Sequence, residues 1–345
     1  MIESNVIAID LAKNVFQVCK LSSRGQVIWN KQVNRSKLIA LLVNEPVSLV
    51  AMESCGGTHY WARFAKTCGH SIKAMSARRV KAFLQGHKTD ANDAIAIGLA
   101  ALQPAVKSSR TITLEEQCQQ GITMMRDLAV RQKVALAKQL RDQLLELGHP
   151  INKGDAALLR RVPEIVEDAE NGLPDFYREA LYHQYQQLRA FFAHVDALEK
   201  RFKEAVRQDP VCRRLSALEG VGPVGAMLLK LALSQPGHFN NARQAAACVG
   251  VTPVQHSSGG KEKLGSISKL AGDKKLRSVL FEGALAVIRS LDKREAKTIK
   301  EQWLKQLIHR RGKKVTAIAL ANKTVRTAYA MLKKNTDYQP ALLAG

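Results

Sequence analysis

The sequence predicts an α/β domain at the N-terminal end of the chain, followed by a mostly helical remainder. Short β-branched segments alternate with helical ones at the start, and two long stretches with helical periodicity follow. Of the 345 residues 46% are hydrophobic but only 5% are aromatic, so Ala, Leu and Val supply much of the apolar content, which favours helices. We expect three domains, over residues 1–107, 108–208 and 209–345.

The first domain is predicted to begin with three strands in a meander. Residues 5–20 read as a strand, a turn and a second strand, and residues 27–33 add a third strand after a turn that contains Gly. A helix over 36–44 follows. The near-continuous apolar run at 47–52 predicts a central strand that is buried on both faces. Further along we expect a helix after Gly57, a strand at 71–75, and helices over 77–84 and 90–102.

The middle of the chain predicts two long helices. Residues 114–147 and 176–206 carry apolar residues at three- and four-residue spacing, whereas residues 149–174 contain Gly and Pro breaks. This pattern predicts a helical hairpin or coiled coil, an element that usually serves as a spacer or in dimerisation. The last domain begins near Pro210, and we expect residues 341–345 to form a loose tail.

The charge of the chain favours a polyanionic partner. The formal net charge is +23, and residues 253–345 alone contain 20 Lys and Arg against 7 Asp and Glu. Nucleic acid is the usual partner of such a protein, the alternative being a merely soluble basic chain. The six cysteines form no C-x-x-C pair, and we find no signal peptide and no apolar run of ~18 residues. These features predict a cytoplasmic, nucleoid-associated protein without a zinc site, a disulfide framework or a membrane anchor.

Four acidic residues of the first domain form a pattern that packing does not explain. Asp10 ends the strand I-A-I-D, and Glu53 directly follows the strand L-V-A-M. Asp90 and Asp93 are three residues apart at a helix start, so they share one face. Asp90 could instead serve as the N-cap of the helix, but this role would not explain the other three acids. Carboxylates in this order predict a two-metal Mg²⁺ site for phosphoryl transfer, with Lys88 either near the phosphates or merely solvated.

Two segments of the last domain have features suited to phosphates. Residues 215–232 have the form of a helix-hairpin-helix, in which Gly220 and Gly222 would let backbone N–H groups approach a phosphate; an ordinary turn between helices is the alternative.

Residues 253–277 are dense in Ser, Gly and Lys, and the plain interpretation is a flexible basic loop. The alternative is a nucleophilic serine, exposed by two glycines, with His256 as a candidate base. Such a serine needs a positive field, for which the segment offers Lys261, Lys263, Lys269 and Arg277.

The motifs, taken in order, resemble those of the insertion-sequence one-ten family of transposases, in its one-eleven-eleven branch. The family also includes the Piv-type DNA invertases. The resemblance covers nearly the whole chain. It rests on A-I-D-x-x-K at 8–13, M-E-S-C-G at 52–56, K-T-D-x-x-D at 88–93, G-V-G-P at 220–223, G-V-T-P at 250–253, and S-G with I-S-K and L-R downstream.

The resemblance implies a ribonuclease H-like (RuvC-like) D-E-D-D domain, a coiled-coil linker and a C-terminal transposase domain. It implies a catalytic serine directly before the glycine of the S-G motif, which is Ser258, with Ser257 beside it. It also implies a structured guide RNA that pairs with donor and target DNA, and a dimer or tetramer in which carboxylates and serine come from the same or different protomers.

Three functions are compatible with these features. The first is an RNA-guided recombinase in which Mg²⁺ on the carboxylates assists attack by Ser258. The second is a RuvC-like junction nuclease that uses the carboxylates to activate water. The third is a nucleic-acid-binding protein without catalysis, in which Asp10→Asn would leave every activity intact.

Overall fold

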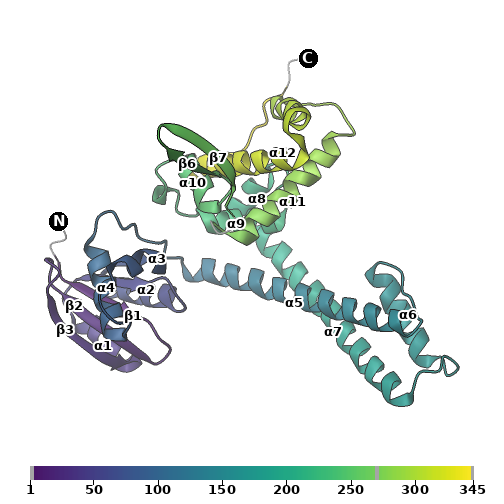
Figure 1. Ribbon diagram of the computed structural model, residues 1–345, viewed down its shortest axis with the longest axis horizontal. Coiled ribbons are helices and arrows are strands. Elements are labelled where there is room, and N and C mark those ends of the chain that lie inside the picture. Colours follow the sequence, from purple (N-terminus) through teal and green to yellow (C-terminus); the bar gives the residue numbers. More distant parts are fainter. Residues whose placement is uncertain (1–3, 269–271, 343–345) are drawn as a thin grey trace. The chain divides into compact units, whose positions relative to one another are not determined.

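The computed structural model describes residues 4–268 and 272–342. The chain forms two compact units, Met1–Gln117 and Cys118–Gly345, and the boundary falls within the long helix α5 (Leu114–Glu146) (Figure 1). Each unit has hydrophobic cores of its own.

A mixed five-stranded sheet forms the centre of the first unit, with strand order β3-β2-β1-β4-β5. The strands β1 (Val6–Asp10), β2 (Val15–Leu21) and β3 (Val27–Asn34) are antiparallel neighbours. In contrast, β4 (Leu49–Glu53) runs parallel to β1, and β5 (Ser71–Met75) runs parallel to β4. This order and these directions are those of a ribonuclease H-like fold, which confirms the predicted fold class.

Helices cover both faces of the sheet. Ile7, Ile9, Val50 and Met52 pack on one face, with α1 (Arg35–Asn44) and α2 (Thr58–Thr67). The alternate residues of β1 and β4 point to the other face and pack with α4 (Asp90–Leu102). Because both faces are covered, β1 and β4 are apolar and buried up to the acid that ends each strand, as the run at 47–52 predicted for β4.

One helix of the first unit is shorter than the periodicity predicted. We expected a helix over 77–84, but α3 ends at Val80, and a 3-10 turn (Lys81–Phe83) follows it. The chain then reaches Gly86, whose φ is +74°, and this left-handed conformation turns it towards α4.

The middle of the chain contains the two predicted long helices. α5 and α7 (Asp175–Gln208) pack together, and four of the five buried residues of α7 recur every seven positions: Leu181, Leu188, Val195 and Phe202. A seven-residue apolar repeat is the pattern of coiled-coil packing.

Between these helices lies an element that the sequence did not reveal. Residues 155–167 form α6 (Asp155–Glu167), although Pro163 lies inside it. A proline there removes the hydrogen bond to the carbonyl four residues earlier, that of Leu159. The Tyr185 hydroxyl of α7 donates to this oxygen instead, at 3.0 Å. A tertiary contact therefore satisfies the group that the proline leaves unpaired.

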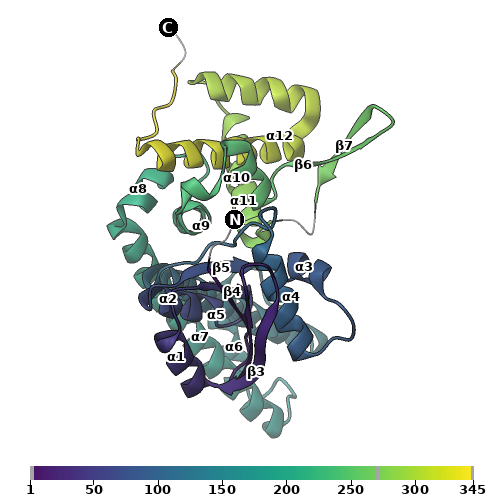
Figure 2. The same cartoon turned by 90° about the vertical axis from the view of Figure 1, so that its left-hand side faces the viewer.

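The last part of the chain is mostly helical, as predicted. Its helices are α8 (Pro210–Ser216), α9 (Pro223–Leu233), α10 (Ala242–Val249), α11 (Lys274–Leu291) and α12 (Ile299–Lys334), which kinks at Gly312. The exception is a two-stranded hairpin of β6 (Pro253–Ser258) and β7 (Lys261–Ile267), which projects from the helices (Figure 2). Across the described ranges, no helix has the length and apolar character needed to cross a membrane.

Candidate metal centre and serine hairpin

Strand geometry puts Asp10 and Glu53 on the face of the sheet that α4 covers. Val6 and Ala8 pack against α4, and Asp10 is the next residue of β1 on that face. Leu49 and Ala51 occupy the same face of β4, and Glu53 continues it. Since β1 and β4 are parallel neighbours, both acids lie at the carboxyl ends of adjacent strands.

Helix α4 brings the other two acids to this edge. Its N-cap is Thr89, whose hydroxyl accepts a hydrogen bond from the Asn92 N–H at 3.3 Å. The alternative assignment of Asp90 as the N-cap is therefore wrong, and Asp90 and Asp93 both lie in the first turn. Carboxylate oxygens of Asp10, Asp90 and Asp93 lie within 4.8 Å of one another, close enough to share a metal ion.

The carboxylates disfavour one another's charge. Burial raises the pKa of Asp10 to about 6, with further contributions from Asp93, Asp90 and Glu53. Burial and then Asp93 also raise the pKa of Glu53, so this acid belongs to the same electrostatic cluster although it lies outside the close trio. A cluster of this kind gains stability from a bound cation. Lys88 lowers the pKa of both Asp10 and Glu53, which places its charge near them.

Two residues that the sequence analysis missed support this centre. Thr58 fixes the loop after β4, because its hydroxyl donates to the Glu53 carbonyl at 2.8 Å and accepts from the Cys55 N–H at 2.8 Å. Gly98 lets α4 approach the sheet: a Cβ there would lie 2.3 Å from Leu21 Cδ1 and 3.3 Å from Ala8 Cβ. A lone Gly within an Ala-rich helix is a sequence signal for such close packing.

The serine segment is a β-hairpin rather than the flexible loop that was the plain interpretation. Gly259 (φ +55°) and Gly260 (φ +75°) form its two-residue turn, as hairpin turns with two positive φ angles require. The register pairs Ser258 with Lys261 and Ser257 with Glu262. A Gly-Gly pair between two short segments is a known hairpin signal.

The register also separates the two serines. Directly opposed residues share a face and successive residues alternate, so one face carries Ser258, Lys261, His256 and Lys263. The other face carries Ser257, Gln255, Glu262 and Leu264. Both serines are exposed, but Ser258 lies opposite a basic residue, Lys261, whereas Ser257 lies opposite an acidic one, Glu262.

The glycines of the helix-hairpin-helix have different surroundings. Gly220 has φ +76°, and a Cβ there would lie 2.7 Å from the carbonyl oxygen of Gly283 in α11. Gly220 is thus required for packing. Gly222 precedes α9 and is exposed, and a Cβ at this position would meet nothing within 4 Å, so packing does not require a glycine here.

The remaining basic candidates also differ in placement. Arg277 donates a hydrogen bond to the Ser268 carbonyl at 3.0 Å, just beyond the end of β7, and so helps to fix the foot of the hairpin. Lys261 and Lys263 are exposed on β7. Lys269 lies outside the described residues.

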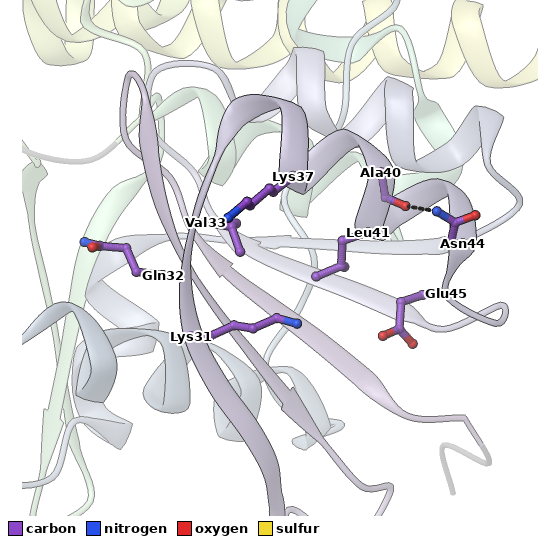
Figure 3. Close-up of a pocket in the computed structure, with 8 residues that line it drawn as sticks. All are labelled: Lys31, Gln32, Val33, Lys37, Ala40, Leu41, Asn44 and Glu45. Carbon is purple, nitrogen blue, oxygen red and sulfur yellow. Dashed lines mark hydrogen bonds between the residues drawn. The ribbon is translucent and has the colours of Figure 1, made fainter.

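A depression of about 480 Å³ in the first unit contains none of the predicted site residues. It lies between β3 and α1, and its lining includes Lys31, Lys37 and Glu45 (Figure 3). The Glu45 carboxylate accepts a hydrogen bond from Lys20 at 2.6 Å. α1 packs on the face of the sheet opposite to α4, so this depression is separate from the carboxylate cluster.

Comparisons with known proteins agree with this architecture. The family model described as transposase, of the DEDD type found in IS110 elements, matches residues 7–149. That of the IS116/IS110/IS902 transposase family matches residues 212–301. The chain is 36% identical to a probable family 20 transposase of Pseudomonas aeruginosa, over 97% of this chain and 98% of the relative. The chain belongs to the IS110 family of transposases.

Two other members of the family have similar coverage. The transposase for insertion sequence element IS1111A of Coxiella burnetii is 32% identical over 98% of this chain and 92% of its own length. The transposase for element IS1328 of Yersinia enterocolitica is 31% identical over 96% and 98%. As an IS110 transposase with a DEDD domain, the protein binds DNA and catalyses its cleavage and transfer, and its acidic trio is suited to holding a metal ion.

Proposed function

We propose that this transposase cuts and rejoins DNA by Mg²⁺-dependent phosphoryl transfer, with Ser258 as the nucleophile and a structured RNA as the guide. The observation that carries the proposal is the placement of the trio Asp10, Asp90 and Asp93 within 4.8 Å in a DEDD domain. The serine hairpin supplies the second half of the mechanism.

The carboxylates are suited to Mg²⁺ because they present only hard oxygen ligands on a rigid framework. Asp10 and Glu53 are fixed by buried strands, and Asp90 and Asp93 by the capped start of α4. Mg²⁺ held there would supply positive charge to the scissile phosphate and to the leaving oxygen. Lys88, whose charge acts on Asp10 and Glu53, would add a contact to the DNA backbone.

Ser258 is the better nucleophile of the two serines on electrostatic grounds. Attack on a phosphodiester brings negative charge to the hairpin, and Lys261 and Lys263 share the face of Ser258. Ser257 instead lies opposite Glu262, which would repel a phosphate. His256 lies on the Ser258 face, where it could accept a proton.

The covalent step conserves the phosphodiester. The Ser258 hydroxyl loses its proton, a bond forms between its oxygen and phosphorus, and the bond from phosphorus to a deoxyribose oxygen breaks. That oxygen takes up a proton and leaves as a hydroxyl. A hydroxyl of another strand can then attack the phosphoserine and release Ser258, so strands are exchanged without an external energy source.

The charge of the protein supports binding to both nucleic acids. Its net charge of +23 suits RNA and DNA backbones, and few bases need to be read by the protein if a guide RNA pairs with the DNA. We assign backbone contacts to Lys88, Gly220, Gly222, Lys261, Lys263, Lys269 and Arg277. Carboxylates and serine would reach one phosphate within a protomer or across the protomers of a dimer or tetramer.

Trapping a protein–DNA adduct tests the nucleophile. Wild-type protein, Ser258→Ala and the matched control Ser257→Ala are incubated with end-labelled element DNA, RNA from the element and Mg²⁺, then separated under denaturing conditions. We expect an adduct with the wild type and with Ser257→Ala, and none with Ser258→Ala. Cleavage and religation by Ser258→Ala would rule out the serine mechanism.

A RuvC-like junction nuclease that activates water is the second candidate. It is favoured by one observation: the acidic trio forms entirely within the first unit, without the serine. In that case Ser258→Ala would still cleave DNA and no adduct would form. The guide is tested separately by sequencing RNA that copurifies with the protein, and recovery of only random cellular RNA would contradict it.

A further inference from the structure

The second unit has a groove that no part of the proposed mechanism uses. Its volume is about 870 Å³, and it lies along α12, beside α10 and the start of β6. The residues that matter for its chemistry are Trp303, Asn322, Lys323, Arg326, Val251 and Pro253. Asn322 donates a hydrogen bond to the Val251 carbonyl at 3.0 Å, which holds α12 against the segment that leads into the serine hairpin.

The walls of the groove combine positive charge with an aromatic ring. Lys323 and Arg326 are exposed, and the Lys323 Nζ lies 4.8 Å from the centre of the Trp303 ring. Within the described parts of the chain, Arg326 makes no hydrogen bond or ion pair. Ala242, Ala319 and Ala330 also line the groove, and Trp303 is half-buried, with its ring packed against a hydrophobic cluster of α11 and α12. Cations beside an aromatic ring are the usual means of binding single-stranded nucleic acid.

We propose that this groove binds a single DNA strand, namely the flank of the strand that Ser258 attacks. A base would stack on Trp303, displacing the Lys323 ammonium towards a phosphate, and Arg326 would contact the next phosphate. This inference rests on the proposed role of Ser258. DNA is the occupant because the strand attached to Ser258 continues as DNA, and because the groove reaches Pro253, the first residue of β6.

The length of the hairpin sets which nucleotides enter the groove. From Pro253 to Ser258 there are five residue steps along β6, or about 17 Å at ~3.3 Å per residue. A stacked strand advances about 3.4 Å per phosphate, so this span corresponds to about five nucleotides. The base on Trp303 is therefore expected about five nucleotides from the cleaved phosphate.

Photocrosslinking tests the placement of the strand. The full-length protein is mixed with element DNA that carries 5-iododeoxyuridine at one of the first ten positions beside the cleavage site, irradiated, and digested for mass spectrometry. We expect a crosslink on Trp303, strongest about five nucleotides from the cut. Crosslinks that map only outside the groove would overturn the proposal, as would stronger crosslinking of an RNA of the same sequence.

Variants test the energetics of the groove, with binding of a fluorescent single-stranded DNA oligonucleotide measured by anisotropy. We expect Trp303→Leu and the pair Lys323→Gln/Arg326→Gln each to weaken binding about tenfold, and Trp303→Phe to retain most of it. Lys334→Gln, an exposed charge change on the same helix outside the groove, should change affinity less than twofold. Equal affinities for groove and control variants would exclude this site.

The two proposals can fail separately. If wild-type protein forms the Ser258 adduct but the groove variants bind DNA normally, only the groove proposal is wrong. If Ser258→Ala cleaves and religates DNA while Trp303 still crosslinks, the serine mechanism is wrong, and the groove binds DNA whose path is not set by Ser258.

Discussion

The carboxylate cluster lies on buried strands and the helix packed against them, whereas the serine hairpin is almost fully exposed. Asp10 follows four residues of β1 that are 0% exposed, and α4 packs directly on that strand. Ser258 ends a strand in which only Val254 is partly covered, and β7 is exposed until Ile267. The carboxylates are therefore fixed before any ligand binds. The position of the serine instead depends on the pairing of β6 with β7 and on the contacts at the base of this hairpin.

This difference in burial suits the different roles proposed for the carboxylate cluster and the serine hairpin. A metal centre needs ligands held at fixed positions, and buried strands provide this. An isolated two-stranded hairpin is marginally stable in water, so its order has to come from its base and from what it binds. We expect the hairpin to become fully ordered only on nucleic acid.

The largest effect is expected at Asp10. Asp10→Asn removes a carboxylate of the trio, and DNA cleavage should fall about 100- to 1,000-fold, a size typical for loss of a catalytic electrostatic group. Mg²⁺ should raise the melting temperature of the wild type but not of the variant. A variant that keeps cleavage would contradict a role for the trio and would favour the function without catalysis.

The same substitution is expected to stabilise the metal-free protein. Burial and nearby carboxylates raise the pKa of Asp10 from 3.8 to about 6, so the folded state binds more protons than the unfolded state in this window. The contribution of Asp10 to the unfolding free energy should therefore fall as the pH rises from 4 to 6 and stay lower above it. Asp10→Asn should raise the unfolding free energy of the metal-free protein by about 1 kcal/mol at pH 7, after allowance for solvent screening. Denaturant titrations with a chelator would measure this.

The next effect concerns the packing of α4. A side chain at Gly98 would overlap Leu21 and crowd Ala8, so Gly98→Val should destabilise the protein by about 2–3 kcal/mol and weaken Mg²⁺ binding. Gly121→Ala is the matched control, because it lies in α5 with nothing within 4 Å of a Cβ and should stabilise the protein by about 0.5–1 kcal/mol. Calorimetry would measure the stability of both variants. An equal loss of stability in Gly121→Ala would show that the effect is not specific to the packing of α4.

The smallest effect should be confined to the hairpin. Gly260 has φ +75° and open space around it, so Gly260→Ala costs about 1 kcal/mol of backbone strain. Because the hairpin opens locally, hydrogen exchange should speed up in β6 and β7 while β1 and β4 stay protected. Gly222→Ala, at a negative φ of −84°, should leave exchange unchanged. Faster hydrogen exchange in β1 as well would mean that the hairpin does not open independently of the first unit.

The sequence by itself determined most of the elements and the chemistry of the first unit. The apolar runs ending in Asp10 and Glu53, and the i, i+3 spacing of Asp90 and Asp93, are local patterns. Because side chains alternate along a strand and recur along a helix, such patterns already fix which residues share a face. The ordered motifs also identified the family, which the comparisons confirmed.

Only the tertiary structure decided features that depend on distant partners. α6 forms around Pro163 because Tyr185 satisfies the Leu159 carbonyl. Ser258 shares a face with Lys261 and Lys263 because of the register between β6 and β7, which alternation within either strand alone does not set. Local patterns specify elements and their faces, but pairing between segments is a long-range interaction, and it places the serine opposite a lysine.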